Sequence, residues 1–374
     1  MLDVAYNNLV GQIPSHLSSL SKLVNLSLGM NNLIGIIPAW IGNFSSLYIL
    51  NLARNSLQRS IPSELGLLSG LGKFQLYGNY LCGTIPSLIY NISSIYYFSV
   101  TLNLLHGSNP PDVGLTLPNL QIFAGAVNSF TGIIPASLSN ASQLQVLDFS
   151  QNNLTGTVPQ NLTGLQGLVR LNFELNKLGK MKDGDLNFLN NFANCTSLKV
   201  LSFAQNQFGG ILPSFIANLP MELKSLTMGS NMIRGSIPIR IGNLVNLNLL
   251  GLEGNYLGGP LPDILGKLQN LEGLYLNDNK FSGLMPSSLG NLTALTRLYL
   301  KENEFEGSTP PNLGNCKKLL ILNLSSNNLN DTIPKQVFGL SSLWSRLIKI
   351  KNKIKLFPDK LFLKKWFVAH FYST

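Results

Sequence analysis

Few residues of this 374-residue chain have the types and spacing that catalysis requires. The histidines His16, His106 and His370 are isolated, and none has a cysteine or carboxylate nearby at metal-ligand spacing, so we expect them at the surface. No phosphate-binding glycine loop, H-E-x-x-H pair or G-x-S-x-G nucleophile motif is present. The sequence therefore predicts no catalytic residue, no cofactor and no metal site, and we do not expect an enzyme.

The run Asp183-Gly184-Asp185 has the beginning of a calcium-binding loop. Carboxylates spaced around a glycine are typical of such loops, but the closing glutamate and the remaining oxygen ligands are missing. We therefore expect a solvated loop at this place.

Two groups of tyrosine, amide and charged residues are candidates for binding rather than catalysis. The first group comprises Lys73, Gln75, Tyr77 and Tyr97. The second group, which is flanked by Asp278 and Glu302, comprises Glu253, Tyr275, Asn277, Arg297, Tyr299 and Lys301. Tyrosine and arginine are enriched where proteins bind one another. A solvated surface whose charges pair with one another would contain the same residues, and this alternative stays open.

An internal repeat explains how residues so far apart in the chain can meet. An asparagine closes each L-x-L-x-x-N stretch, and successive asparagines lie 24 or 25 residues apart, except for one interval of 30. These ladder asparagines are Asn7, Asn31, Asn55, Asn79, Asn103, Asn128, Asn152, Asn176, Asn206, Asn231, Asn255, Asn279, Asn303 and Asn327. Such a period indicates a stack of units that bury their apolar faces against one another.

Each unit predicts one short strand that joins a parallel sheet. Leucines of the L-x-L core face inward, so the residues two, four and six positions before the asparagine face outward. Both candidate groups occupy these outward positions. Many other outward residues are small, as in Asn25, Ser27, Gly29, Ile122, Ala124, Ala126, Val200, Ser202 and Ala204. Tyr275 and Tyr299 hold the same position on adjacent strands, which puts them within packing reach.

The recurring asparagine, glycine and Ile-Pro are interpreted as scaffold residues. A buried backbone group without a hydrogen-bond partner costs about 1–3 kcal/mol. An inward asparagine side chain both donates and accepts, so a column of them can bond the backbone of the next turn. The glycine permits backbone conformations that a Cβ forbids, and the proline imposes an extended path.

With N-x-L-x-G-x-I-P in each unit, as in NNLIGIIPAWIGN at residues 31–43, the repeat resembles the plant-type leucine-rich repeat. The resemblance covers residues 1–340, about fourteen repeats with the longer one at 176–206. It implies an α/β-type solenoid, a right-handed superhelix with a parallel β-sheet on the concave face and irregular or 3-10 segments on the convex face. Residues 341–374 would be a degenerate last repeat and a basic tail.

A narrower resemblance lies in the long interval. The run LNKLGKMKDGDLNFLNNFANCTSLKVL is similar to the extracellular region of a plant receptor-like kinase subfamily, that of the elongation-factor-Tu receptor and the rice bacterial-blight resistance receptor. This resemblance implies a module at the extracellular face of the plasma membrane, in plant defence. It would bind a peptide or protein ligand and pair with a shorter leucine-rich-repeat co-receptor kinase. The family's Ser/Thr kinase domain is not found in this sequence.

The chain departs from that family at its flanks. It opens with MLDVAYNN, already inside a repeat, and shows no signal peptide, cysteine-paired cap or stretch of about 20 apolar residues. We therefore expect a truncated fragment of such a receptor. Two alternatives are a secreted inhibitor of the kind that blocks fungal polygalacturonases and an inactive truncated gene product.

Charge is unevenly distributed along the chain. The net charge is +10, but residues 341–374 hold eight of the 27 Lys and Arg and one of the 17 Asp and Glu. The repeats are nearly neutral and show no basic stripe, so nucleic acid is not expected as a partner. The tail could be a misread exon, a capping strand or a segment that lies on an anionic membrane.

Cysteines and glycosylation sequons follow the repeat. Cys82, Cys195 and Cys316 lie five repeats apart, far beyond disulfide reach, so free thiols are expected, with the last two in the core. Ten N-x-S/T sequons occur, and five share one repeat position: Asn43, Asn91, Asn140, Asn194 and Asn291. The other sequons are at Asn25, Asn153, Asn161, Asn323 and Asn330. They are compatible with a secreted glycoprotein.

Overall fold

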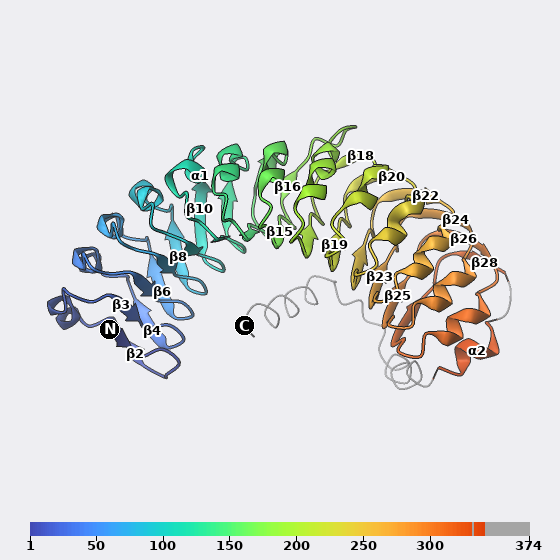
Figure 1. Cartoon of the computed structure of the whole chain (residues 1–374). Coiled ribbons are helices and arrows are strands. Elements are labelled where there is room, and N and C mark those ends of the chain that lie inside the picture. Colours follow the sequence, from blue (N-terminus) through green and yellow to red (C-terminus); the bar gives the residue numbers. More distant parts are fainter. Residues whose placement is uncertain (331–332, 341–374) are drawn as a thin grey trace.

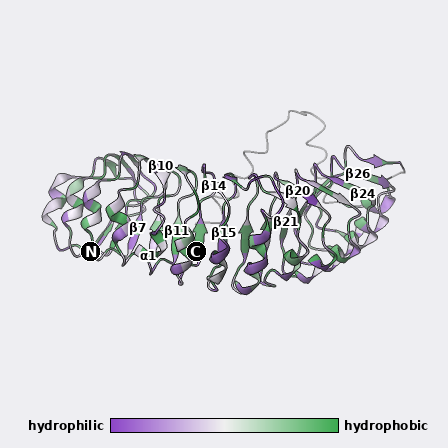
Figure 2. Ribbon diagram, turned by 90° about the horizontal axis from the view of Figure 1, so that it is seen from above, coloured by the Kyte–Doolittle hydropathy of each residue, from purple (hydrophilic) through white to green (hydrophobic). Residues whose placement is uncertain are grey.

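The repeats stack into a curved solenoid, with strands on the inner side of the arc and short helices on the outer side (Figure 1). The structure is a computed structural model and describes residues 1–330 and 333–340. The predicted tail, 341–374, lies outside the described residues. Seen from above, the units form one continuous row in which hydrophilic and hydrophobic segments alternate (Figure 2).

The concave face is one parallel sheet of fourteen strands, one per repeat, paired in chain order. The middle residue of nearly every strand is buried, as the inward leucines of L-x-L predict; Leu26, Leu50 and Phe74 align across three neighbours. The strands are β1 (Leu2–Asp3), β3 (Asn25–Ser27), β5 (Ile49–Asn51), β7 (Lys73–Gln75), β9 (Tyr97–Ser99), β11 (Ile122–Ala124), β13 (Val146–Asp148), β15 (Arg170–Asn172), β17 (Val200–Ser202), β19 (Ser225–Thr227), β21 (Leu249–Gly251), β23 (Gly273–Tyr275), β25 (Arg297–Tyr299) and β27 (Ile321–Asn323).

A second row of short parallel strands follows the asparagines, which the sequence analysis did not predict. The N-x-L-x-G stretch is extended, with its leucine inward, and forms two six-stranded sheets and one pair. These strands are β2 (Val10–Gly11), β4 (Asn32–Gly35), β6 (Ser56–Arg59), β8 (Tyr80–Gly83), β10 (Leu104–Ser108), β12 (Ser129–Thr131), β14 (Thr155–Gly156), β16 (Lys177–Leu178), β18 (Gly209–Ile211), β20 (Met232–Gly235), β22 (Tyr256–Gly259), β24 (Lys280–Leu284), β26 (Glu304–Gly307) and β28 (Asn328–Leu329).

The convex face consists of 3-10 turns and two single-turn α-helices. Most follow a proline in extended conformation, such as Pro38 before Ala39–Asn43, which is the path expected of Ile-Pro. The elements are η1 (Ser15–Ser19), η2 (Ala39–Asn43), η3 (Ser63–Leu67), η4 (Ser87–Asn91), α1 (Val113–Thr116), η5 (Ala136–Asn140), η6 (Gln160–Gly164), η7 (Asn187–Asn194), η8 (Ser214–Asn218), η9 (Ile239–Asn243), η10 (Asp263–Lys267), η11 (Ser287–Asn291), η12 (Pro311–Asn315) and α2 (Lys335–Phe338). A Cβ on Gly42 would lie 2.2 Å from the Glu64 carbonyl oxygen, so glycine sets the close helix spacing.

Each ladder asparagine from Asn31 onward ties its own repeat to the preceding one. Asn79 Nδ2 donates to the carbonyls of Leu76 (3.0 Å) and Leu52 (3.1 Å), and its Oδ1 accepts from the Leu57 N–H (3.0 Å). The expectation that the asparagine bonds the next turn was therefore wrong in direction. The side chain points back along the solenoid because the preceding turn leaves these backbone groups without ladder partners.

The residue before each ladder asparagine adopts a left-handed backbone conformation. All fourteen repeats share a positive φ at this point, although glycine occupies it only in two of them. The residues are Tyr6, Met30, Arg54, Gly78, Leu102, Val127, Gln151, Leu175, Gln205, Ser230, Gly254, Asp278, Glu302 and Ser326. This turn aims the following asparagine inward, and the varied residue types gave no sequence signal for it.

The long repeat forms an ordered loop rather than the solvated loop that we expected. Asp185 is buried, and its Oδ2 accepts hydrogen bonds from the N–H groups of Lys180 (2.8 Å), Lys182 (3.2 Å) and Gly209 (3.1 Å). The expectation was wrong for Asp185 because three otherwise unpaired backbone donors converge on its carboxylate.

Asp183, in contrast, is exposed at the edge of this loop. Its carboxylate pairs with the Arg234 guanidinium at 2.8 Å. The ion pair joins the loop to β20, while the buried Asp185 organises the loop from within.

The cysteines and histidines lie as expected where the structure describes them. Cys195 and Cys316 are buried free thiols whose pKa burial raises to about 11, whereas Cys82 is a free and exposed thiol. His16 and His106 are exposed, and His370 lies outside the described residues. Over the same part of the chain, no helix combines the length and apolarity needed to cross a membrane.

Candidate ligand-binding surface

The first candidate group lies on β7 and β9 near the N-terminal end of the concave face. Lys73 and Gln75 are half-buried, and the Lys73 Nζ lies 4.8 Å from the centroid of the Tyr97 ring. This distance is within the range of a cation–π interaction. Tyr77 was expected to be a surface residue, but only 7% of it is exposed, and the same repeat position is also buried at Ala53 and Ala126.

The second candidate group centres on two stacked tyrosines. Tyr275 and Tyr299 are register partners on β23 and β25, and their ring centroids lie 5.1 Å apart with the planes inclined by 13°. The packing contact expected from their shared repeat position is therefore present. Both rings are half-buried, so part of the stack is open to the concave space.

Three glycines at outward positions shape this patch. A Cβ on Gly273 would lie 2.8 Å from the Tyr275 ring, so the ring lies directly on the glycine backbone. A Cβ on Gly229 would lie 2.3 Å from Glu253 Oε1, and one on Gly251 would lie 3.1 Å from Glu253 Oε2. The glycines thus leave room for the Tyr275 ring and the Glu253 carboxylate close to the backbone of the sheet.

Arg297 and Glu253 set the electrostatics around Tyr275. Burial raises the pKa of the Tyr275 hydroxyl, and the Glu253 carboxylate raises it further. Arg297, the register partner of Gly273, opposes this shift through its charge and a hydrogen bond. The tyrosine therefore remains a neutral hydrogen-bonding group at physiological pH.

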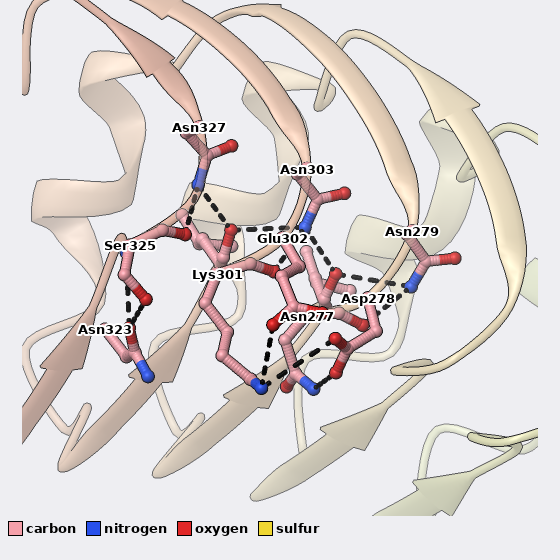
Figure 3. A network of polar contacts seen from close by, with 11 residues as sticks. Asn277, Asp278, Asn279, Lys301, Glu302, Asn303, Asn323, Ser325 and Asn327 are labelled. Carbon is pink, nitrogen blue, oxygen red and sulfur yellow. Dashed lines mark hydrogen bonds and ion pairs between the residues drawn. The ribbon is translucent and has the colours of Figure 1, made fainter.

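A polar network extends from the stack toward the C-terminal end of the sheet (Figure 3). The Lys301 Nζ lies 3.8 Å from Asp278 Oδ1 and 3.4 Å from Glu302 Oε1, and Asn277 Nδ2 donates to Asp278. Burial raises the pKa of Asp278, but hydrogen bonds with Glu302 and Asn277 and the Lys301 charge lower it by more. The hydrogen bond with Asp278 and its negative charge raise the pKa of Glu302. These charges offset one another next to the tyrosines.

A third polar cluster lies at the middle of the concave face, and the sequence analysis missed it. Asp148 is 1% exposed; its carboxylate accepts from Ser150 Oγ (2.8 Å) and Asn172 Nδ2 (3.2 Å), and the Arg170 Nε lies 3.4 Å away. The signal was available, because Asp148, Arg170, Asn172 and Glu174 all hold outward repeat positions. The cluster is well packed, which favours a structural role for Asp148.

Glu174 extends this cluster toward β17 and β19. Its Oε2 accepts from Ser202 Oγ at 3.0 Å, and Ser202 Oγ in turn lies 2.5 Å from Thr227 Oγ1. Burial raises the pKa of Glu174, and the Asp148 charge adds to this, while Ser202 and Arg170 oppose it. A carboxylate held in this way is a pH-sensitive point on the concave face.

The sequons differ in accessibility. The five that share a repeat position, at the ends of η2, η4, η5, η7 and η11, all have exposed asparagines. Asn25 differs from them, since it lies on the concave sheet and its Oδ1 is buried. Over the described residues, no group of three or more His, Cys, Asp and Glu side chains is arranged to hold a metal ion.

A family profile described as Leucine Rich Repeat matches six segments of the chain: residues 22–44, 143–165, 197–219, 270–292, 294–316 and 318–340. The repeats are leucine-rich repeats. The plant-type repeat and the solenoid expected from the asparagine spacing are thus confirmed.

Parts of the chain are similar to plant receptor kinases. It is 49% identical over 76 residues to the LRR receptor-like serine/threonine-protein kinase EFR of Arabidopsis thaliana. It is also 41% identical over 68 residues to the receptor kinase-like protein Xa21 of Oryza sativa subsp. japonica. These stretches cover 20% and 18% of this chain but only 7% of either kinase. The predicted similarity to this group of receptors is confirmed for the repeat region.

Solved structures of plant receptor ectodomains share the fold. The ectodomain of the Arabidopsis receptor kinase HAESA, solved with an N-terminally extended IDA peptide hormone, matches with a TM-score of 0.82 and 34% identity. The match covers 91% of this chain and 56% of the HAESA chain. A complex of HAESA with IDA and the co-receptor SERK1 matches with a TM-score of 0.68 and 28% identity, over 91% and 68% of the two chains.

Proposed function

We propose that the concave face of this chain recognises a peptide or protein ligand without catalysing a reaction, as part of a receptor ectodomain in plant defence. The observation that carries the proposal is the Tyr275–Tyr299 stack, in which the Tyr275 ring lies against Gly273 and charged residues flank the pair. Rigid aromatic rings bury a large area at a small entropic cost, and such anchors dominate protein recognition.

The similar proteins support this proposal. HAESA was solved with a peptide hormone, and in one structure also with a co-receptor. By the same logic, a shorter leucine-rich-repeat kinase is the proposed co-receptor, and the extracellular face of the plasma membrane is the proposed location. The inhibitor and inactive-product alternatives remain open hypotheses that no contact in the structure favours.

A peptide selection tests the proposal. Peptides are selected from a random display library on the wild-type chain, and their dissociation constants are then measured for Tyr275→Ala/Tyr299→Ala. Loss of two anchor residues typically costs several kcal/mol, so we expect affinity to fall by at least about 100-fold.

A double variant on another surface provides the control. Tyr80 and Tyr256 are exposed at the same position of the second strand row, on β8 and β22. Tyr80→Ala/Tyr256→Ala should leave the affinity unchanged. Equal affinity of wild type and Tyr275→Ala/Tyr299→Ala would rule out the stacked tyrosines as the anchor.

A further inference from the structure

A second feature of the concave face is a hollow at its N-terminal end, distant from the tyrosine stack. It has a volume of about 470 Å³ and is lined by residues of β1, β3, β5 and β7 and of the turn after β1. Most of its lining is polar, and only Ala5, Ile49 and Tyr6 contribute largely apolar side chains. Lys73 and Gln75 of the first candidate group belong to this hollow.

The floor of the hollow is a row of polar side chains, one from each strand. The register aligns Asp3 with Ser27, Ser27 with Asn51 and Asn51 with Gln75. Asn51 Nδ2 donates to Ser27 Oγ at 3.2 Å, which orients both groups. Serine, asparagine and glutamine each donate and accept, so the row offers both kinds of hydrogen bond at the spacing of the strands, about 4.8 Å.

Next to this row, the side-chain amide oxygen of Asn25 is buried and receives no hydrogen bond from any residue within the described part of the chain. This atom, Oδ1, is inaccessible to solvent. Leaving such a group unpaired costs about 1–3 kcal/mol, so a rotation of the Asn25 side chain that lets a ligand hydroxyl donate to this oxygen would recover that free energy.

The lining of the hollow offers a peptide no aromatic anchor of the kind found at the tyrosine stack. Tyr6, its one aromatic lining residue, is 78% exposed, whereas Tyr275 and Tyr299 are half-buried and stacked.

Oligosaccharide chemistry fits the lining better. In an extended chain of β-1,4-linked pyranose rings, each ring advances by close to one strand spacing and presents hydroxyls that both donate and accept. The apolar C–H faces of the rings can pack on Ile49 and Tyr6. Asp3 and Lys73 supply one charge of each sign, which favours a neutral sugar over a polyanion.

We propose that this hollow binds a neutral β-1,4-linked oligosaccharide of about four rings, one for each of its strands. The Asn25 amide and the row of Ser27, Asn51 and Gln75 would bond the hydroxyls. This site is independent of the tyrosine patch, and neither proposal requires the other.

Titration calorimetry with tetrasaccharides tests the proposal. The probes are β-1,4-linked tetramers of glucose, mannose and xylose, with the tetramer of galacturonic acid as the charged comparison. The protein must carry an unmodified Asn25, verified by mass spectrometry, because Asn25-Leu26-Ser27 is a sequon. We expect at least one neutral tetramer to bind, and Asn25→Leu and Gln75→Ala each to weaken it at least tenfold.

The controls separate this site from the tyrosine patch and from misfolding. Tyr275→Ala/Tyr299→Ala should bind the sugar as the wild type does. Gln75→Ala should keep the wild-type melting temperature, and Asn25→Leu should match or exceed it, because it removes an unpaired buried acceptor. Asn25→Leu should also keep the affinity for library-selected peptides. Absence of binding by all three neutral tetramers, preference for the galacturonate tetramer, or unchanged sugar binding by both hollow variants would overturn the inference.

Discussion

At the scale of single residues, the shape of the concave face depends on where side chains are small. Gly273 lets the Tyr275 ring lie on the sheet, and Gly229 does the same for the Glu253 carboxylate. The stacked aromatic pair therefore depends on a glycine two residues before Tyr275 on the same strand and on a tyrosine in register on the next strand.

Glu174 gives the first prediction, a pH-dependent stability. Its pKa is raised in the folded chain, chiefly by burial, so the folded state holds the proton more tightly than the unfolded state does. The stabilising effect of the protonated form is complete below the ordinary pKa of 4.5 and is lost as pH rises through the folded pKa. Glu174→Gln keeps an acceptor for Ser202 but stays neutral, so its melting temperature should exceed that of the wild type at about pH 8 and match it near pH 4.

Thermal unfolding at both pH values checks this expectation. Glu304→Gln, at an exposed glutamate on β26, serves as the control and should show no such difference. A Glu174→Gln variant that is less stable than the wild type at high pH would show that the charged carboxylate stabilises the cluster.

The sequence predicted some of these residue roles and missed others, for physical reasons. Tyr275 and Tyr299 were predicted as neighbours because register alone determines their distance. Tyr77 was expected to be exposed, but its repeat position is buried here as it is at Ala53 and Ala126, which the alternation along one strand does not predict. The Asp148–Glu174 cluster was overlooked although its members hold outward repeat positions, because the pattern does not show which of them form hydrogen bonds across strands.

At the scale of elements, each repeat joins a predictable strand to a turn that the sequence describes less well. The L-x-L strands follow directly from alternation. The second strand row was missed because N-x-L-x-G has too few residues to show a period of its own. The left-handed residue before each asparagine was missed because twelve of the fourteen are not glycine.

The loop of the long repeat gives a prediction with a matched pair of variants. Asp185→Asn leaves only a neutral amide oxygen where a charged carboxylate oxygen accepts from three backbone N–H groups, and should destabilise the loop by roughly 1–3 kcal/mol. Asp183→Asn weakens only an exposed ion pair with Arg234, which is worth about 1 kcal/mol or less.

Hydrogen–deuterium exchange measures the difference locally. In Asp185→Asn, the backbone amides of Lys180, Lys182 and Gly209 should exchange much faster than in the wild type. In Asp183→Asn, the same amides should exchange at nearly the wild-type rate. Equal exchange in the two variants would contradict the role assigned to Asp185.

At the scale of the whole molecule, the solenoid has two long surfaces: the concave face, which we propose for ligand binding, and the convex side, which carries the shared glycosylation sequons. The exposed sequons at the ends of η2, η4, η5, η7 and η11 lie with the turns of the convex side, away from the strands of the concave sheet. The repeat count, the sheet and this division could be predicted from the 24-residue period. The polar hollow could not be predicted in this way, because its lining combines side chains from four strands and from the turn after β1.

Glycan mapping tests this division. After expression through a eukaryotic secretory pathway, mass spectrometry of glycopeptides should find glycans on Asn43, Asn91, Asn140, Asn194 and Asn291. Asn25 should remain unmodified, because its amide oxygen is buried on the concave sheet. Modification of Asn25 together with bare convex sites would contradict the assignment of the two faces.

Photo-crosslinking tests the central claim, that the tyrosine patch of the concave face receives the ligand. A library-selected peptide that carries a benzophenone is irradiated with the wild-type chain, and the crosslinked residues are mapped by mass spectrometry. Crosslinks within β21, β23 and β25, lost in Tyr275→Ala/Tyr299→Ala, are the predicted result. Crosslinks that fall on the convex turns or on the second strand row would contradict it.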